Sequence, residues 1–144
     1  MSNQQYIEQL FGTMGQLRKL FEKHVQELHE DKTSTFMQFS ALKFLKMNEN
    51  NTVGDIAAYL RLSKSSATQL IERLAKSGLV DRIDDKEDRR IVHVVITQTG
   101  IEKLIEMKKR FIGKMAELLK EVPEADLKEL VRRQTILIET LQQK

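Results

Sequence analysis

Polar and basic side chains gather on one face of the stretch Ser63–Ser77. Apolar residues recur there at three- and four-residue steps, from Ala67 to Leu74, which predicts a helix with its opposite face in a core. The polar face carries Lys64, Ser65, Thr68, Gln69, Glu72 and Arg73. The candidates for DNA contact on this helix are Lys64, Ser65, Ser66, Thr68, Gln69 and Arg73. A helix fits the DNA major groove, and short polar side chains near its start can form hydrogen bonds with base edges. A polar helix face taken alone more often simply faces solvent, and the DNA-contacting alternative depends on the elements that follow this helix.

A second group of charged side chains follows in the segment DDKEDRR, residues 84–90. This segment is too charged to be buried. The flanking stretches Leu79–Ile83 and Ile91–Thr97 are rich in β-branched residues and predict the two strands of a hairpin. The charged segment is therefore expected to project into solvent as a wing.

The elements before the wing must position both groups. Thr52 can cap a helix whose apolar residues begin at Val53, and Ser63 can cap the next one. Gly78 can end that second helix with a positive φ angle. The predicted order is helix, turn, helix, wing.

These residues resemble the MarR family of bacterial and archaeal transcription regulators. The resemblance rests on two runs and extends over nearly the whole chain. The runs are Leu74-x-x-x-Gly78-Leu79-Val80, and Asp88-Arg89-Arg90 followed by alternating Val92, Val94 and Ile96 and then by Thr97 and Gly100. The resemblance implies a mainly α (α+β) winged helix-turn-helix with a two-stranded wing and long terminal dimerisation helices.

The domain organisation follows from this resemblance and from length. A chain of 144 residues suits a single compact unit, residues 1–144. Within it we expect a DNA-binding lobe at 35–97 and a helical dimerisation region at 1–30 and 98–144. The helices expected near 6–30, 99–121 and beyond Pro123 carry wide apolar stripes, and a partner chain would cover them.

The resemblance also implies roles for individual side chains. Arg90 would enter the minor groove and Asp88 would hold it in place, while Arg89 and Lys86 would contact flanking phosphates. Further candidates for contacts to the phosphate backbone are Thr33, Ser34, Thr35 and Arg61. The three hydroxyl residues could equally be simple helix caps. Arg61 occupies a turn position where the family often has Gly, so the turn either avoids positive φ or tolerates it at a cost.

Small-molecule control is a further implication, because relatives often respond to aromatic or amphipathic acids. The apolar wall that could form a ligand pocket is Leu17, Phe36, Phe39 and Ile105. Such residues are usually core. The identity of an effector is not readable from the sequence.

Composition and motifs weigh against enzymes and membrane proteins. No apolar run approaches the roughly 20 residues that span a bilayer, and the N-terminus lacks a signal-peptide pattern, so a cytoplasmic protein is expected. The absence of cysteine removes disulfides and thiol redox sensing. His24 and His29 lie about 140° apart around a helix, unlike i, i+4 metal ligands. We expect no enzyme, no cofactor and no metal, with metal binding through His24, His29 or Glu30 of two chains as an alternative.

The sequence thus predicts a sequence-specific, DNA-binding homodimeric repressor that a small ligand releases from double-stranded DNA with a pseudo-palindromic operator. Two alternatives remain. One is a winged-helix protein-interaction module without DNA binding, and the other is a metal-responsive regulator of the same fold. The exposed pair Asp88 and Arg90 argues against the first, because folding alone does not require those residues.

Overall fold

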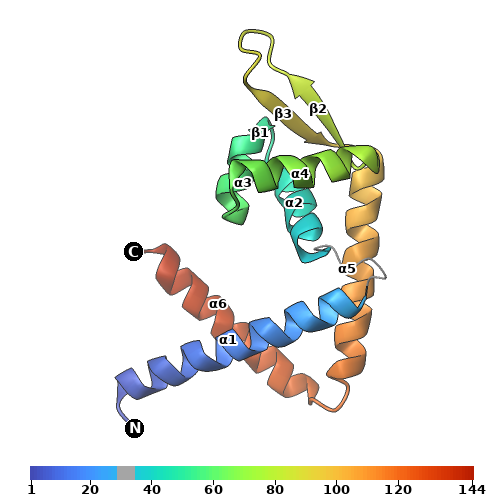
Figure 1. Cartoon of the computed structure of the whole chain (residues 1–144). Helices are drawn as coiled ribbons and strands as arrows, with labels where there is room; N and C mark the ends of the chain where they lie inside the picture. The colour runs from blue at the N-terminus through green and yellow to red at the C-terminus, as the bar shows by residue number, and fades with distance from the viewer. Residues whose placement is uncertain (29–34) are drawn as a thin grey trace. The chain divides into compact units, whose positions relative to one another are not determined.

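A computed structural model describes residues 1–28 and 35–144 of the chain (Figure 1). The chain divides into two compact units, Met1–Phe111 and Ile112–Lys144. The elements, in chain order, are α1 (Asn3–Glu27), α2 (Thr35–Met47), β1 (Asn51–Thr52), α3 (Val53–Leu60), α4 (Lys64–Lys76), β2 (Val80–Asp84), β3 (Val92–Ile96), α5 (Gln98–Leu118) and α6 (Glu124–Gln142). The predicted winged helix-turn-helix is confirmed. The assignment of 1–144 to a single compact unit, with a lobe at 35–97 and dimerisation helices at 1–30 and 98–144, stays a prediction.

The sheet has three antiparallel strands in the order β1-β3-β2. The loop between β2 and β3 is the predicted wing, and Figure 1 shows the β2–β3 hairpin extending beyond α3 and α4. Strand β1 was not predicted, because two residues are too short to show a period of two. It pairs Asn51 with Val94 and Thr52 with His93, so β3 is the central strand. The base of the wing is therefore held from both sides.

The core of the first unit lies between α2, α3, α4 and the sheet. Helix α2 contacts β3, and α4 contacts β2 and α3. Fully buried side chains from all of these elements meet there, among them Leu42, Ile56, Leu70, Ile71, Leu74, Val80 and Val94. Each such side chain contributes about 1.5–3 kcal/mol relative to exposure. This burial holds the polar face of α4 outward.

Local hydrogen bonds set the two helices of the motif. Thr52 Oγ1 accepts from the Asp55 amide at 3.2 Å, and Asp55 Oδ2 accepts from the Thr52 amide at 2.8 Å, which forms a capping box. Ser63 Oγ accepts from the Ser66 amide at 3.1 Å. Both predicted caps are confirmed, and so is the positive φ of Gly78, at 72°.

The turn between α3 and α4 is left-handed at Arg61, whose φ is 54°. The second of the two sequence alternatives is therefore correct. Leu62 donates its amide to the Ala57 carbonyl at 2.9 Å, which closes α3 in the manner usual for a left-handed C-terminal cap. A residue with a side chain has a conformational cost there of about 1–2 kcal/mol.

Hydrogen bonds of Thr97, Gly78 and Gly100 form a joint that connects β3 to α5. Thr97 Oγ1 donates to the Gly78 carbonyl at 2.6 Å and accepts from the Gly100 amide at 3.0 Å. A Cβ atom at Gly100 would lie 2.1 Å from the Leu79 carbonyl oxygen, so only glycine fits. The joint therefore fixes the start of α5 against the end of α4.

Helix α5 ends at Leu118, three residues before the predicted Glu121, and Pro123 precedes α6 as expected. Within the described residues, none of the helices combines the length and the apolar character that a membrane span requires.

Candidate nucleic-acid interface

The outward face of α4 consists of side chains that the core does not use. Lys64, Ser65, Gln69 and Arg73 are exposed, and within the described part of the chain their side chains form no hydrogen bond or ion pair. They are free to meet a ligand. The face also includes two hydroxyl residues with internal partners, described next.

Two of the predicted contact residues already take part in local hydrogen bonds. Thr68 Oγ1 donates to the Lys64 carbonyl at 2.8 Å, and its side chain is half-buried. Ser66 Oγ accepts from Ser63 Oγ at 2.9 Å. Each hydroxyl can still use a remaining lone pair or, for Ser66, its hydrogen. Gln69 is thus better placed than Thr68 to form new hydrogen bonds with both its donor and its acceptor.

The wing presents a guanidinium that a carboxylate holds in place. Asp88 Oδ1 accepts from Arg90 Nε at 3.1 Å and from the Arg90 amide at 3.0 Å, and Asp88 Oδ2 accepts from an Arg90 terminal nitrogen at 3.2 Å. The side chain of Arg90 is nonetheless 90% exposed. The guanidinium therefore stays available on its outer edge, while its inner edge is fixed by a bidentate pair.

The hydrogen bonds of Arg90 also act on Asp88. First the side chain of Arg90 and then its backbone amide stabilise the charged carboxylate, so the pKa of Asp88 is lowered from its ordinary value. The carboxylate is ionised at any pH at which the protein would meet DNA. Lys86 and Arg89, the other predicted wing residues, are exposed beside it.

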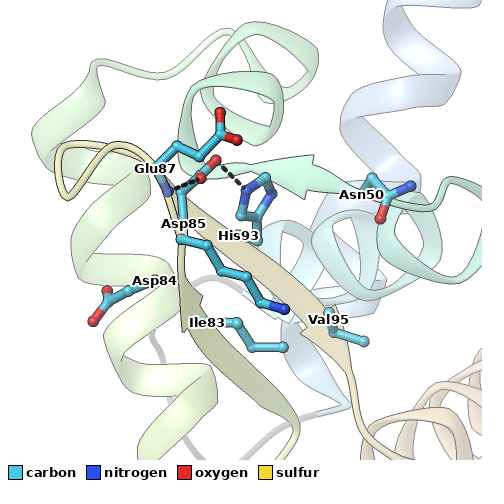
Figure 2. Close-up of a pocket in the computed structure, with 8 residues that line it drawn as sticks. Asn50, Ile83, Asp84, Asp85, Glu87, His93 and Val95 are labelled. Carbon is cyan, nitrogen blue, oxygen red and sulfur yellow. Dashed lines mark hydrogen bonds and ion pairs between the residues drawn. The ribbon is translucent and has the colours of Figure 1, made fainter.

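A third group of side chains lies at the base of the wing, and Lys86 is its only member that was predicted as a site residue. It surrounds a hollow of about 370 Å³, and Figure 2 shows the residues that line it. The lining residues are Asn50, Ile83, Asp84, Asp85, Lys86, Glu87, His93 and Val95.

Asp85 is the centre of this group. Its Oδ1 accepts from the Glu87 amide at 2.9 Å, and its Oδ2 lies 3.1 Å from His93 Nε2. The amide of Glu87, and next the imidazole of His93, lower the pKa of Asp85. The alternation of β3 could have placed His93 on the outer face, because Val92, Val94 and Ile96 take the inner one. The pairing with Asp85 depends on the loop and has no sequence signal.

Comparison with known proteins identifies the family. The model of the MarR family matches residues 35–91. The organic hydroperoxide resistance transcriptional regulator of Bacillus subtilis is 31% identical to this chain over 138 residues, which are 94% of this chain and 88% of that protein. The chain belongs to the MarR family. It is a transcriptional regulator of that family.

Two further likenesses agree with this placement. The transcriptional repressor MprA of Escherichia coli strain K12 is 32% identical over 71 residues, covering 48% of this chain and 40% of that protein. The structure of a MarR family protein from Bacillus stearothermophilus superposes with a TM-score of 0.77 at 20% identity, over 99% of both chains. The structural likeness confirms the fold.

Four further residues of this MarR-family chain were predicted to contact phosphates. Arg61 is exposed at the turn before α4. Thr33 and Ser34 lie outside the described residues, as does the side chain of Thr35. Their predicted phosphate contacts, like every DNA contact named above, stay predictions.

The predicted effector wall also stays a prediction. Phe39 packs against the core, whereas Leu17, Phe36 and Ile105 are exposed. None of the four lines the hollow at the base of the wing. Phe21 and Phe111 pack edge to face with their ring centres 6.3 Å apart, which joins α1 to α5.

No three His, Cys, Asp or Glu side chains among the described residues are arranged to hold a metal ion. His24 Nδ1 lies 3.0 Å from Glu27 Oε2 on α1. His29 and Glu30, the other residues of the metal alternative, lie outside the described residues.

Proposed function

We propose that this MarR-family regulator is a homodimeric repressor that binds a pseudo-palindromic operator in double-stranded DNA. The exposed face of α4 would enter the major groove, and the wing would enter the flanking minor groove. The observation that carries the proposal is the pair Asp88 and Arg90. An exposed guanidinium fixed by a carboxylate is of little use to folding, since exposed ion pairs contribute only about 0–1 kcal/mol.

The assignment of residues follows from what each side chain offers. Gln69 and Lys64 have exposed groups for base edges, and Ser65, Ser66, Thr68 and Arg73 flank them on the same helix. Arg89, Lys86 and Arg61 are exposed cations suited to phosphates. The net charge of the whole chain is only +3, so placement matters more than bulk charge.

Dimerisation is supported by apolar surface that the chain leaves exposed. On α1 these residues are Tyr6, Ile7, Leu10, Phe11, Met14, Leu17 and Leu20, and on α6 they are Leu130, Val131, Ile136, Ile138 and Leu141. A monomer rarely exposes so large an apolar surface. A second copy of the chain would cover it, and two-fold symmetry would then present two α4 helices to one operator.

Repression, release by a small ligand and a cytoplasmic location complete the proposal. Repression is the role named for MprA, the relative described above. The ligand would be an aromatic or amphipathic acid at the wall of Leu17, Phe36, Phe39 and Ile105. A protein that binds chromosomal DNA in a bacterium or archaeon works in the cytoplasm.

Selection from random double-stranded DNA tests the proposal directly. Purified protein is mixed with a random library, and bound sequences are recovered and sequenced over several rounds. We expect an inverted repeat whose half-sites are about 10 base pairs apart. Failure to enrich any sequence, at salt low enough for non-specific binding, would favour the protein-interaction module instead.

A further inference from the structure

The base of the wing contains a titratable pair that none of the contacts proposed above requires. His93 lies on the central strand β3, where it faces Thr52 of β1 on one side and Ile83 of β2 on the other. Its imidazole is therefore anchored to the most constrained part of the sheet. In Figure 2 the ring points toward the Asp85 carboxylate, 3.1 Å from Nε2.

Asp85 carries this anchor into the loop. Its second oxygen accepts the amide of Glu87, and its own amide donates to the Ile91 carbonyl at 3.0 Å. Ile91 in turn donates its amide to the Asp88 carbonyl at 3.0 Å. A continuous path of hydrogen bonds thus runs from His93 through Asp85 to the residue that holds Arg90.

We propose that His93 and Asp85 are positioning residues for the wing, and that protonation of His93 strengthens DNA binding. The inference rests on the proposed function, because it concerns the same wing. In this proposal a proton regulates DNA binding in addition to the small ligand proposed above.

The direction of the effect follows from the charges at the site. Histidine side chains ordinarily change charge between pH 5 and 8. Asp85 has a lowered pKa, so it stays ionised throughout that range. A protonated imidazole therefore turns a hydrogen bond between a neutral donor and the ionised Asp85 into an ion pair in which both partners are charged. It also adds a positive charge at the base of an element that meets polyanionic DNA.

The other charged groups around His93 do not reverse this sign. Asp84, Asp85, Lys86 and Glu87 are the charged residues that line the hollow with it, and Asn50 is the polar residue before β1. Three of these four side chains are negative and Lys86 is positive, so their balance is opposite in sign to the charge that protonation adds. DNA binding should therefore tighten as pH falls from 8 to 6.

The test compares three single variants with the unsubstituted protein. His93→Gln keeps an amide that can donate to Asp85 but does not titrate. Asp85→Asn keeps an oxygen that can accept from Glu87 but removes the carboxylate. His24→Gln is the matched control, because it removes a histidine that pairs with Glu27 at 3.0 Å on α1, outside the winged motif.

The first measurement is the dissociation constant for the selected operator at pH 8, 7 and 6 and constant ionic strength. We expect affinity to rise about fivefold from pH 8 to pH 6 in the unsubstituted protein and in His24→Gln, which lies within the usual range of coupling between two ligands. The rise should disappear in His93→Gln and shrink to less than half in Asp85→Asn. A full rise in His93→Gln overturns the proposal. A full rise in Asp85→Asn overturns the positioning role, because His93 would then act without its partner.

The second measurement needs no DNA. Backbone order parameters of residues 86–90, from nitrogen relaxation, should increase between pH 8 and pH 6 in the unsubstituted protein and stay constant in His93→Gln. Unchanged order in both would overturn the positioning role. Failure of the proposed function is distinguishable, because it would appear as no operator binding at any pH, whatever the order parameters.

Discussion

At the scale of single residues, variants of Asp88 and Arg90 distinguish a wing that contacts DNA from a loop whose charges only face solvent. Arg90→Ala should leave the free energy of unfolding within about 0.5 kcal/mol of the parent, since Arg90 is 90% exposed. It should weaken binding to all DNA sequences and reduce the slope of log K against log salt by about one per subunit. DNA titrations at several salt concentrations measure the affinity and this slope. Arg18→Ala is the control, because Arg18 is also exposed and paired with a carboxylate, Glu22.

The partner of Arg90 supplies a sharper version of the same test. Asp88→Ala removes a negative charge, so simple electrostatics predicts tighter DNA binding. If Asp88 instead positions Arg90, as the contacts at 3.1 and 3.2 Å indicate, binding should weaken. Tighter binding at moderate salt would contradict the assignment of the wing.

We expect α4 to determine base specificity, and Gln69 is the residue with the most freedom to provide it. Gln69→Ala should relax base preference at one position in each half-site, with a loss of about 1–3 kcal/mol on the preferred base. Affinities for an operator set with every single-base change measure this. Ser65→Ala, at another exposed position on the same face, is the comparison. An identical ranking of all bases for parent and Gln69→Ala would remove Gln69 from the interface.

The extent of sequence-based prediction differs among these residues for physical reasons. The faces of α4 follow from a helical period, whereas the contact between Asp88 and Arg90 was implied by the family resemblance. The link between His93 and Asp85 spans eight residues and depends on hairpin register, so no local pattern indicates it. Arg61 left two alternatives open, because a non-glycine residue at positive φ is uncommon but allowed.

At the scale of elements, the bounds and the sheet show where local rules stop. Caps at Thr52 and Ser63 and the break at Pro123 come from side-chain chemistry, and all three agree with the structure. Strand β1 forms only because β3 offers a free edge to two residues that have no strand pattern of their own. Tertiary context therefore decides this strand.

The joint between β3 and α5 permits a prediction about the stability of the fold. Thr97→Val keeps the shape but removes the hydroxyl that donates to the Gly78 carbonyl and accepts from the Gly100 amide. The free energy of unfolding should fall by about 1–3 kcal/mol, because groups in a tight joint lose a partner. Chemical denaturation measures the change. Thr99→Val, an exposed threonine in the first turn of α5, is the control and should shift stability by less than about 0.5 kcal/mol.

At the scale of the whole molecule, the exposed apolar surface of α1 and α6 is the feature that requires an explanation. Two long helices, α1 and α6, have no buried residues, although both carry apolar side chains at helical spacing. Propensity alone barely stabilises isolated helices of this kind in water, and most of their stability comes from packing. The chain alone therefore does not account for the stability of its own ends, and a second copy is the simplest cover that symmetry allows.

A charge on this surface should prevent the second copy from docking. Phe11 is 66% exposed, so Phe11→Glu should have little effect on the fold of one chain. In a dimer it would remove about 2 kcal/mol of apolar burial per copy, which is roughly thirtyfold in the dissociation constant for each copy, and would bury a charge as well. Gln9→Glu places the same charge on an exposed polar position of α1 and should leave the dimer intact. Sedimentation velocity over a range of concentrations gives the oligomeric state, and circular dichroism gives the helix content.

Removal of residues 1–28 extends the same argument to the whole interface. Without α1 the apolar stripe of α6 would lose the surface that we expect to cover it, so the truncated chain should aggregate or unfold. A folded, soluble monomer after truncation would contradict the dimer architecture, whereas Phe11→Glu as a folded monomer that no longer binds the operator would support it. The two variants thus separate loss of the dimer from loss of the fold, which the truncation alone would confuse.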